Sequence, residues 1–181
     1  MNYNCKIKFV TDYLFDRYTD KAKEELVQST SNGIQDTDND EANLLLYQDK
    51  KGLYIPSLQL QKSVENASRA TKWKKTKTNW LKWTIAFLTT TPFNLYLDKK
   101  EPDNYLLSYP KRKDGSRVKK IHPVINAGLQ TEFQVLVSDP DNQYSDRDVE
   151  NLIRKAGMMF GIGGRRADKF GRFEVINFAR A

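Results

Sequence analysis

The sequence contains only one cysteine, Cys5, and only one histidine, His122. A lone cysteine excludes an intrachain disulfide and is typical of a reducing compartment. So few residues of these two types also exclude the zinc sites that are built from them. No apolar run reaches the roughly 18 residues of a membrane span, and the first residues lack the apolar core of a signal peptide. We therefore expect a cytoplasmic protein without membrane contact, metal or cofactor.

Positive and negative charges are concentrated in different parts of a chain whose formal net charge is +7. Residues 11–50 hold ten acidic and four basic side chains, whereas residues 69–120 hold fourteen basic and four acidic ones. Residues 147–181 hold eight basic and four acidic side chains. The basic segments suit a polyanion, and the acidic segment would repel that ligand or meet the basic face of a neighbouring copy. The alternative is that the lysine-rich segments are solvated loops that bind nothing.

Hydrophobic spacing predicts six principal elements. Alternation of apolar and polar residues indicates a strand, and apolar residues at helical spacing after a capping residue indicate a helix. Ser57 and Ser145 are the expected N-caps, the second with Asp148 three residues on, as in a capping box. In chain order the elements are a strand at 5–9, a helix from 57, strands at 81–87 and 129–137, a helix from 145 and a strand at 170–178.

This order, β-α-β-β-α-β, predicts an α+β fold of the ferredoxin-like type, which RNA-recognition modules (RRM) share. We expect a single domain, 1–181, with two insertions. Residues 10–56 form an acidic insertion after the first strand, with a short helix at 21–28. Residues 89–128 form a basic insertion between the second and third strands, where Asp114-Gly115 indicates a projecting hairpin.

A glycine- and arginine-rich segment, residues 161–172, lies between the last predicted helix and the last strand. Its glycines let the backbone turn sharply and approach another molecule closely, and exposed amides in such turns bind anions. Its basic side chains add charge-assisted donors suited to phosphate. The alternative is a connection that only lets a helix turn into a strand. The predicted nucleic-acid-binding residues of this loop are Gly161, Gly163, Gly164, Arg165, Arg166, Lys169 and Arg172.

Aromatic side chains accompany the other basic segments. Trp73 lies among lysines, and Tyr105 and Tyr109 flank the predicted basic hairpin. Aromatic faces beside cations suit stacking on unpaired bases, although Trp73 would equally cover a local apolar patch. Trp83, in contrast, is expected in the core. The further predicted nucleic-acid-binding residues are Lys72, Trp73, Lys74, Lys75, Lys111, Arg112 and Lys113.

The stretch from Ser145 to Phe178 resembles the C-terminal part of the RAMP proteins of CRISPR systems, especially the Cas7-like backbone subunits. The similarity is carried by Ile162-Gly163-Gly164-Arg165-Arg166 and by Phe170-Gly171-Arg172-Phe173-Glu174-Val175. The same stretch is similar to small phage-encoded proteins that end in a Gly-Arg-Phe-Glu-Val strand.

The resemblance implies a ferredoxin-like palm, with residues 10–56 as a fingers-like insertion and residues 89–128 as a thumb-like hairpin. It also implies partners. These are single-stranded RNA or DNA, and either further copies of the chain or the other subunits of a ribonucleoprotein complex, in a bacterial cell.

RAMP proteins divide into backbone binders and RNA-cleaving enzymes, so the resemblance leaves catalysis open. Some Cas7-like subunits cleave RNA with an aspartate after the first strand, where this chain has Asp12, Asp16 and Asp20. At a spacing of four these carboxylates would share a helical face and hold a divalent ion, or else form a solvated acidic face, which we favour. His122, beside Pro123, is expected on the surface rather than in an acid–base role.

We therefore expect a non-enzymatic protein that binds the backbone of a single-stranded nucleic acid, RNA rather than DNA. The resemblance implies that copies assemble head to tail along the strand, as Cas7-type subunits do. Two alternatives remain. One is a metal-dependent RNase that uses an aspartate of the first insertion. The other is a phage protein-interaction module or virion component.

Overall fold

The computed structural model describes residues 1–17, 42–71, 80–109, 115, 117, 119–139 and 144–181. Its largest sheet has four strands in the order β10-β1-β9-β5, and every neighbouring pair is antiparallel. These strands are β1 (Asn2–Phe9), β5 (Leu88–Thr91), β9 (Gln130–Val137) and β10 (Phe173–Arg180). The first and third strands of this sheet in chain order thus lie side by side at its centre.

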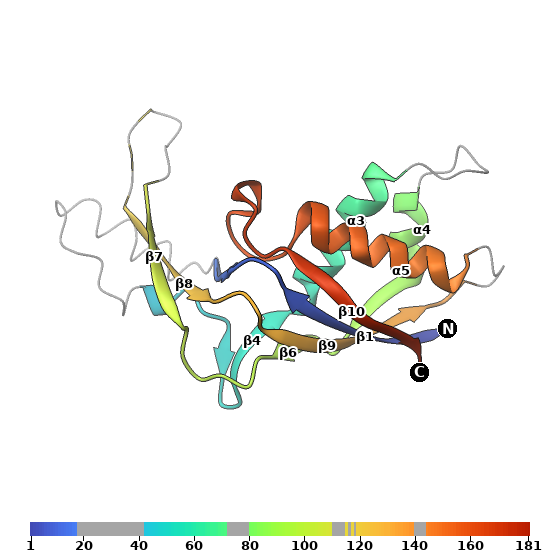
Figure 1. The fold of residues 1–181 in the computed structure, drawn as a ribbon, viewed down its shortest axis with the longest axis horizontal. Coiled ribbons are helices and arrows are strands. Elements are labelled where there is room, and N and C mark those ends of the chain that lie inside the picture. Colours follow the sequence, from blue (N-terminus) through green and yellow to red (C-terminus); the bar gives the residue numbers. More distant parts are fainter. Residues whose placement is uncertain (18–41, 72–79, 110–114, 116, 118, 140–143) are drawn as a thin grey trace.

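Three α-helices of the described chain lie on one face of this sheet (Figure 1). They are α3 (Ser57–Ala70), α4 (Trp80–Phe87) and α5 (Asp146–Lys155). The predicted capping box at the start of α5 is confirmed, because the Ser145 side chain accepts from the Asp148 N–H and the Asp148 carboxylate accepts from the Ser145 N–H. After Lys155 the chain continues as a π-helix, η1 (Ala156–Phe160).

Alternation along β1 divides the large sheet into two faces. Tyr3, Cys5, Ile7 and Phe9 are buried toward the helices, whereas the residues between them are exposed or half-buried on the opposite face. Burial raises the pKa of the Cys5 thiol to about 12, so this cysteine is protonated at neutral pH. The predicted strands at 5–9 and 129–137 are both confirmed, and the core lies between them and the helices.

Two smaller antiparallel sheets adjoin the large one. One has the order β2-β8-β7, with β2 (Tyr13–Leu14), β7 (Asn104–Ser108) and β8 (Lys120–Ile125). The other has the order β3-β4-β6, with β3 (Gln48–Asp49), β4 (Gly52–Pro56) and β6 (Asn94–Tyr96). The β7–β8 pair, which lies where the sequence predicts a basic hairpin, projects from the body of the molecule (Figure 1).

The predicted strand at 81–87 is wrong, because these residues form α4 and the second strand of the large sheet begins only at Leu88. The apolar residues fit helical spacing as well as alternation. Trp83 and Phe87, four residues apart, have ring centroids 6.2 Å apart, and Trp83 is only 6% exposed, as expected of a core residue. Ile85, which alternation would have buried with them, is 57% exposed.

Two element boundaries also differ from the prediction. The N-cap of α3 is Pro56 rather than Ser57, and the Ser57 hydroxyl instead lies 3.5 Å from the Thr90 carbonyl oxygen, which accepts from it. The last strand begins at Phe173 rather than at 170 and continues to Arg180. The predicted helix at 21–28 lies outside the described residues. Among the described helices, none has the length and apolarity that spanning a bilayer requires.

The capping box allows a direct test of how α5 is held. Replacing Ser145 with Ala leaves the Asp148 N–H without its side-chain acceptor, and we expect unfolding to become easier by about 1 kcal/mol. The control is Asn151→Ala, an exposed position within α5, where alanine favours the helix. Urea denaturation of both variants measures the difference, and equal stabilities would contradict a contribution from the cap.

Candidate nucleic-acid interface

The loop of residues 161–172 connects η1 to β10 and begins with a sharp reversal. Gly161 has a φ of 64°, in the left-handed region, and its N–H donates to the Ala156 carbonyl oxygen over 2.8 Å. A short 3-10 helix, η2 (Arg166–Asp168), occupies the middle of the loop. The loop therefore has a defined backbone conformation from the end of η1 to the start of β10.

The glycines of the loop lie against other parts of the same chain. A Cβ on Gly163 would lie 2.7 Å from the Tyr13 ring, and one on Gly164 would lie 2.9 Å from Cβ of Asp16. A Cβ on Gly171 would overlap with the Ile162 carbonyl oxygen. Close internal packing thus accounts for these glycines without any ligand.

Hydrogen bonds fix the loop to the segment that follows β1. The Gly164 N–H donates to the Leu14 carbonyl over 2.9 Å, and the Gly171 N–H donates to the Asp12 carbonyl over 2.8 Å. The Thr11 hydroxyl accepts from the Arg172 N–H over 2.8 Å and donates to the Lys169 carbonyl over 2.9 Å. Thr11 was not among the predicted site residues, and its separation of 158 positions from Lys169 left no local signal in the sequence.

Three cationic side chains of the loop, in contrast with its glycines, face outward. Arg165, Arg166 and Lys169 are exposed. Arg165 has a φ of 50° and Lys169 a φ of 68°, a region that residues with a Cβ rarely adopt. The Arg165 guanidinium pairs with the Asp168 carboxylate, with Nη2 and Oδ2 2.8 Å apart. Two strained backbone positions therefore carry basic side chains, and such strain is concentrated at functional sites.

Arg172 is more enclosed than the other cations of the loop. Its Nη2 donates to the Arg166 carbonyl over 3.2 Å, while its Nη1 is buried with no hydrogen-bond partner among the described residues. Burial, together with the nearby charge of Arg166, lowers the pKa of the Arg172 guanidinium. Arg172 thus braces the turn that presents Arg166.

Asp16 contacts both the loop and the base of the β7–β8 hairpin. The Asp16 carboxylate forms an ion pair with the Lys120 ammonium over 2.7 Å, and the same aspartate packs against Gly164. His122, also on β8, is only 2% exposed, so the predicted surface position is wrong. Its Nδ1 lies 3.4 Å from the Phe15 carbonyl oxygen, and burial, then the charge of Lys120, lowers the pKa of the imidazole.

The first two aspartates of the predicted acidic cluster do not share a helical face, because Tyr13–Leu14 between them is the strand β2. The Asp12 carboxylate accepts from the Ala127 N–H over 2.8 Å, and Asp16 is paired with Lys120. In the part of the chain that the structure describes, no three His, Cys, Asp or Glu side chains are grouped so that they could hold a metal ion. Asp20 lies outside the described residues.

The other predicted binding residues are distributed as follows. Lys72, Trp73, Lys74 and Lys75, and the hairpin residues Lys111, Arg112 and Lys113, lie outside the described residues. Tyr105 donates its hydroxyl to the Asn43 side chain over 2.8 Å, whereas Tyr109 is 54% exposed.

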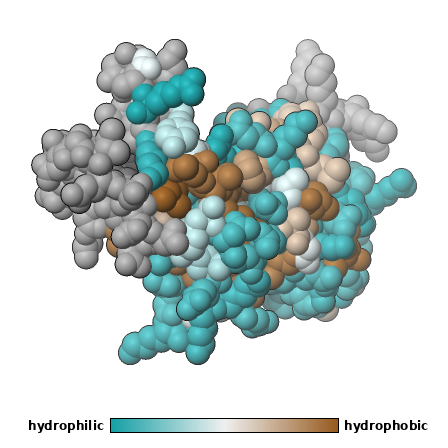
Figure 2. Space-filling model, turned by 60° about the vertical axis from the view of Figure 1, so that its left-hand side comes forward, coloured by the Kyte–Doolittle hydropathy of each residue, from teal (hydrophilic) through white to brown (hydrophobic). Residues whose placement is uncertain are grey.

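Apolar side chains are exposed next to the loop and on the projecting hairpin. Val10, whose N–H donates to the Arg172 carbonyl, is 43% exposed, and Leu107 on β7 is 45% exposed. Figure 2 shows hydrophobic surface gathered where the projecting hairpin meets the body of the molecule. The loop and the hairpin base together thus present cations and apolar groups side by side.

Comparison with known proteins identifies a shared fold. The chain is similar to a chain of a structure described as a Type IV-B CRISPR complex, with a TM-score of 0.53 and 10% sequence identity. The match covers 99% of this chain and 90% of the other. No protein-family model and no curated protein matches the chain. The likeness shows that this mixed α and β chain, with its several antiparallel sheets, has a fold found in a CRISPR complex.

Two glycines with positive φ separate the effect of backbone strain from that of close packing. Gly128 has a φ of 98°, and a Cβ added there would meet nothing within 4 Å, whereas Gly171 has a φ of 66° and abuts Ile162. We expect Gly128→Ala to destabilise by about 1–2 kcal/mol through strain alone. Gly171→Ala should cost about 1–3 kcal/mol more, because the loop must shift. Denaturant titration measures both, and equal losses would refute the close packing.

Burial of His122 predicts a pH-dependent stability. Its pKa is lowered from 6.5, so the unfolded chain binds a proton that the folded chain does not, and stability falls as the pH drops below 6.5. One proton gives a slope of up to about 1.4 kcal/mol per pH unit. His122→Gln should remove this slope in chemical denaturation between neutral and mildly acidic pH, where carboxylates stay ionised. A slope that persists unchanged in the variant would exclude His122 as its source.

Proposed function

We propose that this protein binds the backbone of a single-stranded nucleic acid, RNA rather than DNA, as a subunit of a ribonucleoprotein complex. The observation that carries the proposal is the loop of residues 161–172. Its backbone is fixed by internal hydrogen bonds, and its exposed cations stand beside the base of a projecting hairpin. Cations held on a rigid backbone suit phosphates, which position a strand without reading its sequence.

The palm is proposed to be ferredoxin-like and of the RAMP type. The strand order β10-β1-β9-β5, with α3 and α4 between β1 and β5 and with α5 between β9 and β10, supports this assignment. Residues 10–56 and 89–128 are then the fingers-like and thumb-like insertions. The similarity in fold to a chain of a Type IV-B CRISPR complex supports a place in a complex of the same kind. We propose that this complex acts in the bacterial cytoplasm and that its gene is bacterial or phage-borne.

Contact with the ligand is proposed to be divided between phosphate and base. Arg165, Arg166 and Lys169 would meet phosphates, and the Asp168 carboxylate now paired with Arg165 would be exchanged for a phosphate oxygen. Two exposed apolar side chains, Val10 next to the loop and Leu107 on β7, would lie against unpaired bases. The basic segments outside the described residues, at 72–75 and 111–113, would extend the same contact.

Binding without cleavage is favoured over a metal-dependent RNase. Asp12 is engaged by the Ala127 N–H and Asp16 by Lys120, so both carboxylates already have structural partners. A carboxylate used to hold a catalytic ion would have to give up these contacts.

The exposed cations provide the test. Replacing Arg166 and Lys169 together with Ala should weaken binding to single-stranded RNA, because two phosphate contacts are lost. It should also reduce the slope of log K against log salt by about 0.7 for each contact. Fluorescence anisotropy of a labelled oligonucleotide across a salt series measures both quantities. Unlike Arg172, neither side chain is enclosed, so the loop is expected to keep its conformation.

The matched control is Lys50→Ala with Lys100→Ala, which removes the same charge from two exposed positions. Lys50 lies in the turn that connects β3 to β4. The ribbon of this hairpin lies at the opposite edge of the molecule from the loop (Figure 1). An equal loss of salt dependence in the control would mean that net charge alone attracts the RNA. RNA shortened on incubation with Mg²⁺ would favour the RNase instead.

A further inference from the structure

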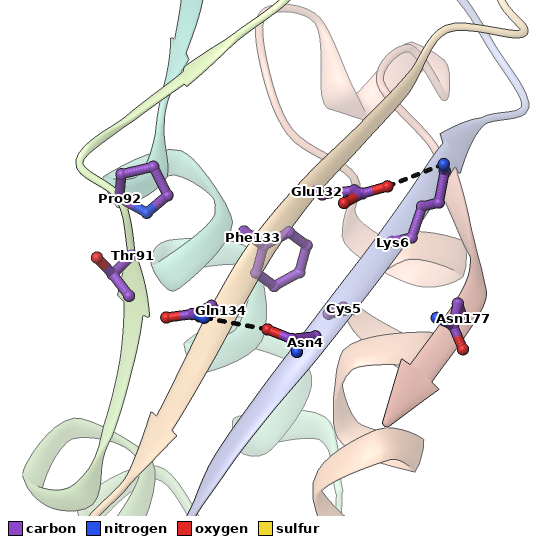
Figure 3. Close-up of a pocket in the computed structure, with 9 residues that line it drawn as sticks. All are labelled: Asn4, Cys5, Lys6, Thr91, Pro92, Glu132, Phe133, Gln134 and Asn177. Atoms are coloured by element: carbon purple, nitrogen blue, oxygen red, sulfur yellow. Dashed lines mark hydrogen bonds and ion pairs between the residues drawn. The ribbon is translucent and has the colours of Figure 1, made fainter. Parts of the chain in front are cut away.

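The face of the large sheet opposite the helices carries a hollow that is separate from the loop of residues 161–172. Asn4 and Lys6 of β1, Glu132 and Gln134 of β9 and Asn177 of β10 project from this face (Figure 3). With Thr91 and Pro92 at the end of β5, they line a cavity of about 400 Å³. None of these residues is among the nucleic-acid-binding residues predicted from the sequence.

This cavity is electrically neutral in a chain of net charge +7. Its two charged side chains, Lys6 and Glu132, form an ion pair of 2.9 Å, and the Gln134 amide donates to the Asn4 side chain over 3.0 Å. Directly opposite pairs on neighbouring strands make both contacts. A phosphate backbone gains little from such a surface, whereas two copies of a basic protein repel each other least where the surface is neutral.

Phe93 directly follows Pro92, which lines this cavity. Its side chain is 88% exposed, the largest fraction among the exposed large hydrophobic residues described. Its backbone is held in place, because the Phe93 carbonyl accepts from the Ser57 N–H over 2.8 Å and β6 begins at the next residue. An exposed aromatic ring on a fixed backbone is typical of an interface anchor, because the side chain has few rotatable bonds and loses little conformational freedom on burial.

A protruding ring and a hollow on neighbouring residues form a self-complementary pair. A two-fold axis places each protrusion of one copy opposite the hollow of the other, which is how isologous dimers are built. The hollow is large enough, because a cavity of roughly 150 Å³ already accommodates a benzene ring. Its lining includes the ring of Pro92, which offers apolar contact, and amide side chains that can form hydrogen bonds at the edge.

We propose that two copies of this chain form a two-fold dimer through this sheet face, with Phe93 of each copy in the cavity of the other. The occupant of the cavity is thus a phenylalanine of a second copy. The dimer does not depend on nucleic acid, and it leaves the loop of residues 161–172 on each copy free to bind a strand.

Sedimentation velocity of the nucleic-acid-free protein over a wide range of concentrations tests the proposal. We expect a monomer–dimer equilibrium in the wild type. Phe93→Ala should raise the dimer dissociation constant by about thirtyfold or more, the effect of losing an aromatic anchor. Because the ring is exposed in the monomer, the melting temperature of the variant, measured at a concentration where the protein is monomeric, should stay the same. A wild type that is monomeric at every concentration would overturn the proposal.

Leu58→Ala is the matched control, since Leu58 is another large side chain, 63% exposed, in the first turn of α3. It should dimerise as the wild type does, and an equal loss in both variants would overturn the role of Phe93. Gln134→Arg should also prevent dimerisation by filling the cavity. A mixture of Phe93→Ala and Gln134→Arg retains one intact contact, so it should form more dimer than either variant alone. Failure to do so would overturn the reciprocal arrangement.

The result is independent of the proposed nucleic-acid binding. Arg166→Ala with Lys169→Ala should dimerise normally while binding RNA weakly, and Phe93→Ala should bind a short RNA normally while remaining monomeric. A monomeric wild type whose Phe93 becomes protected from solvent only when RNA is added would assign this face to the nucleic acid and overturn the dimer.

Discussion

The attachment of the loop at 161–172 to the segment after β1 is the constraint on which the candidate site depends. Thr11, Asp12 and Leu14 supply the acceptors and donors that fix the loop, and Gly163 and Gly164 allow the loop to approach that segment closely. Because backbone hydrogen bonds and the close packing of its glycines define the turn, Arg165, Arg166 and Lys169 are left to face solvent. One arrangement therefore serves both rigidity and the presentation of charge.

The parts of the fold that depend on local pattern could be predicted from the sequence. Alternation in β1 and β9 and the capping box of α5 each lie within a few consecutive residues, and all three are confirmed. The stretch 81–87 was mispredicted because Trp83 and Phe87 satisfy both a helix and a strand, so the choice rests on tertiary packing. The ring of Trp83 packs on Tyr144, a contact that no local window contains.

The candidate site was predictable only in part, for a related reason. Composition identified the loop and its cations, since glycine and arginine are adjacent in the chain. The partners that hold and flank it are distant in sequence, as with Lys120, which pairs with Asp16 across 104 positions. The glycines indicated close approach to another molecule, and the structure shows close approach to Tyr13, Asp16 and Ile162 of the same chain. His122 likewise lies against a distant part of the chain, because β2 pairs with β8 and the Phe15 carbonyl oxygen lies beside the imidazole, which sequence spacing does not reveal.

The segment after β1 and the loop of residues 161–172 are far apart in the sequence, so they are synthesised at different times. Thr11 and Lys169 are 158 positions apart, so the ribosome must add every residue between them before this contact can form. Closing so long a loop costs entropy that only the assembled sheet offsets, because β10 must pair with β1 at the same time. A nascent or truncated chain that lacks β10 therefore contains the basic residues of the loop but cannot hold them in the arrangement seen in the folded protein. The outward presentation of these cations is therefore a property of the folded sheet and not of the loop sequence alone.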